Sequence, residues 1–130
     1  MIDPRLERYA ARAYSLLTNY WFIADSHFDF LHARPGAVEI FGRAQLLDSS
    51  MLYITEVTEI RHGRLGKIDY SYQFRHEGED GFFRYDNASH GRPGPNHHKH
   101  LGGKRIISIP QPPTLLEVIK EIEDILTKEF

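Results

Sequence analysis

The chain has 130 residues, 41% hydrophobic and 12% aromatic, with a formal net charge of −2. These values are typical of a single folded domain over residues 1–130 and argue against disorder. The lack of cysteine excludes disulfides and thiolate metal centres, and no apolar run approaches the ~20 residues that cross a bilayer, so we expect a cytoplasmic protein.

The first 25 residues have the pattern of an amphipathic helix. Asp3 is a suitable N-cap, Pro4 fits the first helical position, and apolar residues recur at helical spacing after them. The segment also carries more aromatic side chains than one small core needs. We therefore expect that it could support a homodimer through Tyr9, Tyr20 and Trp21.

From His27 the period of the pattern changes towards two, which predicts β-strands. The strictest alternation of apolar and polar residues runs from Ile68 to Arg75, and a further strand begins at Phe82. No period is visible in the segment after Asp86, which is rich in glycine, proline and histidine and is predicted to be a loop. A short extended piece from Arg105 to Ile109 follows it. Residues 27–109 are thus predicted to form five or six strands and a His-rich loop.

Residues 113–128 predict a closing helix. Thr114 and Glu117 have the spacing of a reciprocal capping box, and an apolar stripe follows them. Sequential strands with a helix at each end indicate an α+β fold. We expect an antiparallel β-meander of five to six strands, flanked by an N-terminal and a C-terminal helix that pack on one face.

Residues 84–100 call for a chemical explanation, because four of the eight histidines fall in this stretch. Histidine exchanges protons near neutral pH and is also the commonest metal ligand. The surrounding residues 60–106 hold nine Lys or Arg against five Asp or Glu, which favours a phosphate-bearing partner. The four histidines are His90, His97, His98 and His100.

One interpretation is metal-independent cleavage of RNA. His98 and His100 would act as general base and general acid, and Asp86 would orient an imidazole. Lys99 and Arg84 would stabilise charge on the phosphate. The residues expected to bind nucleic acid are Arg84, Lys99, His97, Asn87 and Lys104.

Three other interpretations stay open at this point. The histidines could bind Zn²⁺ or another divalent metal, with His90, His98, His100 and Asp86 as candidate ligands. They could instead satisfy backbone groups in a long ordered loop. The chain could also be a non-enzymatic protein-interaction module that binds a partner through an exposed strand or its aromatic helix end.

Several segments, taken together, resemble the TumE family of type II toxin–antitoxin toxins. The matching segments are Leu47-Asp48-Ser49-Ser50, Leu52-x-Ile54-x-Glu56, Ile68 to Tyr72, Arg84 to Ala88 followed by His90, His97 to His100, and Pro112 to Glu117. The resemblance implies a growth-inhibiting toxin that is neutralised by a small antitoxin, often a helix-turn-helix protein. It also implies a working surface of Arg84, Asp86, Asn87, His90, His98, Lys99 and His100. Ribonuclease activity is our inference from the residue chemistry.

Overall fold

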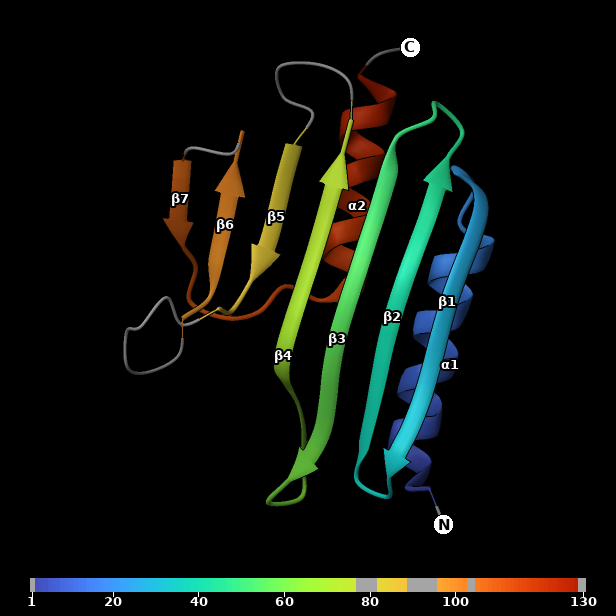
Figure 1. Ribbon diagram of the computed structural model, residues 1–130, viewed down its shortest axis with the longest axis vertical. Coiled ribbons are helices and arrows are strands. Elements are labelled where there is room, and N and C mark those ends of the chain that lie inside the picture. The colour runs from blue at the N-terminus through green and yellow to red at the C-terminus, as the bar shows by residue number, and fades with distance from the viewer. Residues whose placement is uncertain (1, 77–81, 89–95, 103–104, 129–130) are drawn as a thin grey trace.

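The computed structural model describes residues 2–76, 82–88, 96–102 and 105–128, which form a seven-stranded sheet and two helices (Figure 1). The strands lie in the sheet in their order along the chain, and each neighbouring pair is antiparallel. The predicted antiparallel meander with a helix at each end is confirmed, but it has seven strands rather than five or six. The strands are β1 (Ile23–Arg34), β2 (Ala37–Leu46), β3 (Met51–Arg61), β4 (Arg64–Arg75), β5 (Phe82–Asp86), β6 (His98–Leu101) and β7 (Arg105–Ser108).

Strand β6 is the element that the sequence pattern does not predict. An irregular loop was expected at His98–Leu101, and this expectation is wrong, because the segment pairs with β5 on one side and β7 on the other. Its three leading residues are histidine, lysine and histidine, so both faces of the strand are polar. No alternation of apolar and polar residues therefore marks it as a strand.

Helix α1 (Pro4–Asn19) begins as the sequence predicts. The carboxylate of Asp3 accepts a hydrogen bond from the backbone N–H of Arg5 at 2.8 Å, and Pro4 opens the first turn. The helix ends at Asn19, and β1 begins at Ile23, before the change of period at His27. The change of period becomes visible only after the strand has begun, because residues 24–26 show no alternation of apolar and polar side chains.

The aromatic residues of the N-terminal segment have different surroundings. The hydroxyl of Tyr9 points inward and donates to Glu56, whereas Trp21 is 51% exposed and its Nε1–H donates to Glu123 of the C-terminal helix at 2.6 Å. A homodimer through this segment stays a prediction.

Helix α2 (Leu115–Thr127) has the predicted capping box. The Thr114 hydroxyl accepts from the Glu117 N–H at 3.1 Å, and the Glu117 carboxylate accepts from the Thr114 N–H at 3.0 Å. Both exchanges satisfy backbone donors that a helix start leaves without partners. The apolar stripe of the helix is buried against the sheet through Leu115, Val118, Ile119, Ile122 and Leu126.

Both helices lie on the same side of the sheet (Figure 1). The hydrophobic core fills the space between them and the inward side chains of the strands, such as Ile40, Ile54 and Tyr72. The other side of the sheet carries no helix in the part of the chain that the structure describes, and we call it the open face. Phe41 and Tyr53 are large side chains exposed there, at positions that alternate with the core residues.

Gly42 lets β1 and β2 approach each other closely. Its φ is +151°, and a Cβ atom at this position would lie 2.0 Å from the backbone oxygen of His27. Any side chain here would therefore push the two strands apart.

Candidate active site

Four of the predicted site residues gather on the open face where β5 meets β6. The register pairs Arg84 with His100 and Asp86 with His98. Directly paired residues of antiparallel strands project to the same face of a sheet. That face is the open one, since the intervening residues Tyr85 and Lys99 reach α2 on the other side. We call Arg84, Asp86, His98 and His100 the Asp86 cluster.

Asp86 lies at the centre of this cluster. Its Oδ2 accepts a hydrogen bond from Arg84 Nε at 2.8 Å and lies 3.2 Å from His100 Nε2. Its Oδ1 lies 3.7 Å from His98 Nδ1, and the two imidazole rings are 6.3 Å apart between centroids. The carboxylate and both imidazoles are less than a tenth exposed, whereas the Arg84 side chain is 35% exposed. The guanidinium is thus the part of the cluster that reaches solvent.

His100 Nε2 contacts two groups that require different protonation states. Arg84 Nη2 lies 3.4 Å away and can only donate, so this contact requires an Nε2 without a proton. The ionised carboxylate of Asp86 can only accept, so the contact with Oδ2 requires a proton on Nε2. The ring can therefore change its preferred partner when it gains or loses a proton. This property suits a group that transfers protons during a reaction.

Asn87 extends the pairing of β4 and β5 with its side chain. Its Nδ2 donates to the backbone oxygen of Ile68 at 3.0 Å, and its Oδ1 accepts from the backbone N–H of Tyr70 at 3.1 Å. Both ends of the amide are therefore engaged with main chain, so Asn87 holds the end of β5, and with it Asp86, in place.

His97 directly precedes β6, and its ring packs against Tyr70. The two rings stack at 5.8 Å between centroids, and the Tyr70 hydroxyl lies 3.0 Å from His97 Nδ1. Burial, together with the charge of His98, lowers the pKa of His97, which favours a neutral ring. Burial and the charge of Asp86 raise the pKa of Tyr70 to about 12. The tyrosine hydroxyl thus keeps its proton and is suited to donate to the imidazole.

Lys99 lies on the helix-covered side of the sheet. Its Nζ is 2.6 Å from Glu121 Oε2 of α2 and lies over the rings of Phe83 and Tyr85 at 5.4 and 5.1 Å. The structure therefore does not bring Lys99 together with the imidazoles, because successive strand residues point to opposite faces. Two further predicted residues, His90 and Lys104, lie outside the described residues.

Glu56 is another buried carboxylate, and it was not among the site residues predicted from the sequence. It is 3% exposed and accepts hydrogen bonds from the hydroxyls of Tyr9, Tyr72 and Thr58. Lys67 Nζ lies 3.9 Å from its Oε1 and donates to the Pro113 backbone oxygen at 2.6 Å. One signal was present in the sequence: Glu56 continues the inward positions of Leu52 and Ile54 in β3. We call Glu56 and its partners the Glu56 network.

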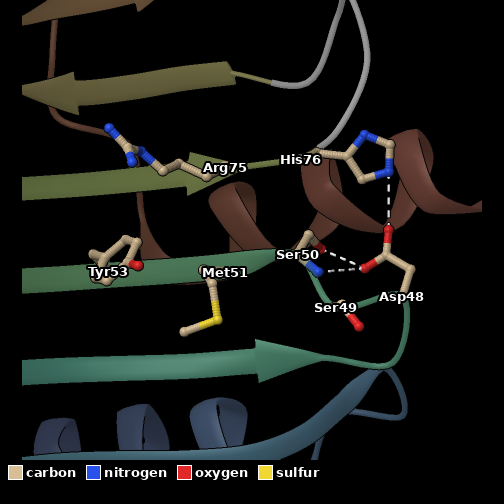
Figure 2. Close-up of a pocket in the computed structure, with 7 residues that line it drawn as sticks. All are labelled: Asp48, Ser49, Ser50, Met51, Tyr53, Arg75 and His76. Carbon is tan, nitrogen blue, oxygen red and sulfur yellow. Dashed lines mark hydrogen bonds and ion pairs between the residues drawn. The ribbon is translucent and has the colours of Figure 1, made fainter.

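A hollow of about 460 Å³ opens where β3 and β4 meet the β2–β3 turn (Figure 2). Within it, His76 Nε2 lies 2.9 Å from Asp48 Oδ2, while Ser50 donates to Oδ1 from its backbone N–H and its hydroxyl. Burial opposes ionisation of Asp48, but the bonds from Ser50 and the charge of His76 outweigh it and lower the pKa of Asp48. These contacts tie the turn to the end of β4.

The metal interpretation assigned ligand roles to Asp86, His98, His100 and His90. Among residues 2–76, 82–88, 96–102 and 105–128, no group of three or more His, Cys, Asp or Glu side chains is placed to hold a metal ion. His90 lies outside these ranges. In the observed arrangement Asp86 is engaged by the guanidinium of Arg84, whose positive charge opposes a cation at the same oxygen.

Comparison with known proteins assigns the chain to a family. The family described as Toxin TumE matches residues 13–127, which is most of the chain and includes the Asp86 cluster and all of the Glu56 network except Tyr9. Searches of curated proteins and of solved structures gave no match. Within the described ranges, neither helix has the length and apolar character needed to cross a membrane. The chain therefore belongs to the TumE toxin family.

Proposed function

We propose that this chain is the toxin of a type II toxin–antitoxin module and that it acts on RNA as an endoribonuclease. The observation that carries the proposal is the Asp86 cluster, in which two imidazoles, a carboxylate and a guanidinium meet on the open face. Such a set can supply a general base, a general acid and a cation for the phosphate. These are the groups that cleavage of RNA through its own 2′-hydroxyl requires.

In the proposed reaction, one imidazole of the pair His98 and His100 removes the proton of a ribose 2′-hydroxyl, and the 2′-oxygen attacks the adjacent phosphorus. The bond from phosphorus to the 5′-oxygen breaks, and the other imidazole gives that oxygen a proton. The products are a 2′,3′-cyclic phosphate and a 5′-hydroxyl end. The 6.3 Å between the ring centroids leaves room for attacking and leaving oxygens on opposite sides of one phosphate.

Arg84 and Asp86 have supporting roles in this proposal. Arg84 is the exposed member of the cluster and would bind the phosphate as negative charge develops on it. Asp86 contacts both imidazoles and would hold them in orientation. Lys99 has no role in the proposed chemistry, because it is paired with Glu121 on the other side of the sheet. For His90 and Lys104, contributions to the site stay predictions from the sequence.

The family membership implies an antitoxin partner. We propose that this partner is a small helix-turn-helix protein encoded beside the toxin, and that both act in the cytoplasm. Co-expression of the two chains should restore the growth that the toxin alone suppresses. Failure of any neighbouring gene product to bind the chain and restore growth would contradict this part of the proposal.

The test of the catalytic proposal is cleavage of single-stranded RNA by the purified chain in the presence of a metal chelator. His98→Ala and His100→Ala should each lower the cleavage rate by about 100-fold or more. His62→Asn is the matched control, since His62 is an exposed histidine in the β3–β4 turn and should leave the rate unchanged. Circular dichroism of each variant verifies that folding is retained.

The product ends test the mechanism itself. The wild-type chain should produce 2′,3′-cyclic phosphate ends, and an RNA with one 2′-deoxyribose at the cleavage position should stay uncut. Cleavage that persists in the His98→Ala/His100→Ala double variant would reject the proposed roles. Cleavage that occurs only after addition of Zn²⁺ or another divalent ion would favour a metal-dependent enzyme instead.

A further inference from the structure

A single row of side chains crosses the open face and ends at the Asp86 cluster. Each member of the row is the register partner of the next, strand by strand from β1 to β6. Adjacent strands are about 4.8 Å apart, so the row is roughly 24 Å long. We call it the cross-sheet row, and its members are His27, Arg43, Tyr53, Gln73, Arg84 and His100.

The cross-sheet row contains cations, an amide and an aromatic ring but no carboxylate, although acidic side chains such as Asp25 and Asp29 flank it on β1. Arg75 follows Gln73 by two residues in β4, so both side chains lie on the same face of the sheet. The guanidinium groups of Arg43 and Arg75 make no ion pair within the described part of the chain. They are therefore available to a ligand that carries negative charge.

The middle of the row offers an aromatic surface. Tyr53 is 37% exposed, and Phe41, at the diagonal position on β2, is 39% exposed. Hollows lie on two sides of Met51, next to this surface. One is lined by Tyr53 and Arg75 (Figure 2), and the other, of about 170 Å³, by Arg43 and His27. An aromatic ring with open space and arginines beside it suits a stacked base whose phosphates reach the cations.

We propose that the cross-sheet row binds one strand of RNA and leads it to the Asp86 cluster. This inference rests on the proposed function and adds the substrate class, which is single-stranded rather than duplex RNA. A ring can stack only on a base that is free of its own helical stack, whereas a duplex presents mainly its backbone and grooves. The cations along the row would bind successive phosphates, and Tyr53 would carry a base.

Binding is measured separately from cleavage. The ligand is a fluorescent single-stranded RNA with 2′-O-methyl riboses, which lacks the free 2′-hydroxyl that the proposed reaction consumes. A duplex of the same sequence is the competing ligand. Fluorescence anisotropy at several salt concentrations gives the dissociation constant and its salt dependence, and thermal unfolding verifies that every variant is folded.

Two substitutions test the row, each with a matched control. Tyr53→Thr keeps a β-forming residue but removes the ring, and should weaken binding about fivefold or more. Tyr53→Phe should retain the wild-type affinity. Arg43→Gln should weaken binding and lower the slope of log affinity against log salt by about 0.7, because one phosphate contact is lost. Arg12→Gln, at an exposed arginine of α1, should leave both quantities unchanged.

The outcomes separate this inference from the proposed function. If wild-type chain cleaves RNA but the Tyr53 and Arg43 variants bind the oligonucleotide as their controls do, the row is not the RNA path while the ribonuclease proposal stands. Equal affinity for duplex, or no binding of the oligonucleotide, also overturns the inference. If the Tyr53 and Arg43 variants keep RNA binding but escape neutralisation by the antitoxin, the row is a protein interface instead. Row-dependent binding without cleavage would support the row and reject the catalytic mechanism.

Discussion

Two of the buried carboxylates in the described part of the chain, Glu56 and Asp86, lie on opposite sides of the same sheet. Glu56 faces the helices, and its partners are three hydroxyl groups and Lys67. Asp86 faces the open side, and its partners are Arg84 and two imidazoles. Burial of a carboxylate is costly unless charge and hydrogen bonds compensate it. Both oxygens of Glu56 accept hydrogen bonds, whereas in Asp86 only Oδ2 accepts one, from Arg84, and Oδ1 has no hydrogen-bond partner among the described residues.

The difference separates a structural site from a candidate reactive one. Burial and the neighbouring Glu56 raise the pKa of Tyr9 and of Tyr72 far above the neutral range, so these hydroxyls keep their protons. The tyrosines of the Glu56 network therefore stay protonated, and the network joins α1, β3, β4 and the segment before α2. The Asp86 cluster instead contains imidazoles, the side chains that exchange protons most readily near neutral pH. We conclude that the groups around a buried carboxylate, rather than its burial, distinguish the candidate reactive site from the structural one.

The largest expected effect on stability is that of Glu56→Gln. The substitution removes the stronger of the two carboxylate charges that compensate the buried ammonium of Lys67, which should lower the free energy of unfolding by about 3 kcal/mol. Urea denaturation measures the loss, and cleavage below the unfolding transition should stay near wild type. Recovery of stability in the Glu56→Gln/Lys67→Met double variant would confirm the cause. A loss of cleavage in a folded Glu56→Gln chain would contradict the division between the two sites.

Asp86→Asn should have the opposite profile. The amide oxygen can still accept from Arg84, but the negative charge that orients the imidazoles is lost. We expect the cleavage rate to fall by about 100-fold, with a smaller loss of stability than Glu56→Gln causes. Single-turnover cleavage and urea denaturation on the same preparations measure both effects. An Asp86→Asn chain that is unfolded at room temperature would place Asp86 with Glu56 as a structural residue.

The buried tyrosines should make the fold sensitive to alkaline pH. Because the pKa of Tyr9 and Tyr72 is raised above the ordinary 10.0, their contribution to stability is complete below that pH and is lost as pH rises through and beyond it. Burial lowers the pKa of Lys67, which has the opposite sign, since stability from this group rises as pH climbs towards 10.5. The difference in unfolding free energy between wild type and Tyr9→Phe therefore isolates the contribution of the Tyr9 hydroxyl, because Lys67 is present in both chains.

The measurement is urea denaturation of wild type and Tyr9→Phe at several values from about pH 8 to about pH 11. The wild-type free energy of unfolding should decrease more steeply above pH 10.0 than that of the variant. Phenylalanine cannot ionise, so its folded and unfolded states bind the same number of protons. Parallel curves for the two chains would show that the Tyr9 hydroxyl is not perturbed by the Glu56 network.

The smallest expected effect is that of Lys99→Met. Lys99 lies between His98 and His100 in the sequence but contacts Glu121 on the other side of the sheet. The pair is partly exposed, so its loss should cost about 0.5 kcal/mol of stability. The rate of RNA cleavage should stay within about twofold of wild type, and single-turnover assays measure it. A large drop in rate without unfolding would return Lys99 to the catalytic group.

Much of the fold could be predicted from local residue patterns. The N-cap at Asp3, the capping box at Thr114 and Glu117, and the alternation in β4 depend on residues a few positions apart. Interactions at such short range can be recognised without knowledge of the rest of the chain. Strand β6 was missed because polar residues on both of its faces leave no hydrophobic period.

The candidate site was predicted only in part. The sequence pattern identified Arg84, Asp86, His98 and His100 as candidate site residues, and the register of β5 and β6 places them side by side. Alternation along an extended segment separates Lys99 from His98 and His100, but its pairing with Glu121 depends on which side of the sheet α2 covers, and no local pattern gives that. The Glu56 network joins residues up to 47 positions apart, which no local pattern reveals.

The amino-acid sequence by itself determined the α+β character, the two capped helices and the identity of the polar residues that carry the candidate chemistry. Local hydrogen bonding and hydrophobic period decide these features. Only the tertiary structure decided which groups surround Glu56 and which side of the sheet carries the Asp86 cluster, since strand register and the side of the sheet that the helices cover set those contacts. Long-range pairing selects among arrangements that the local patterns leave equally open.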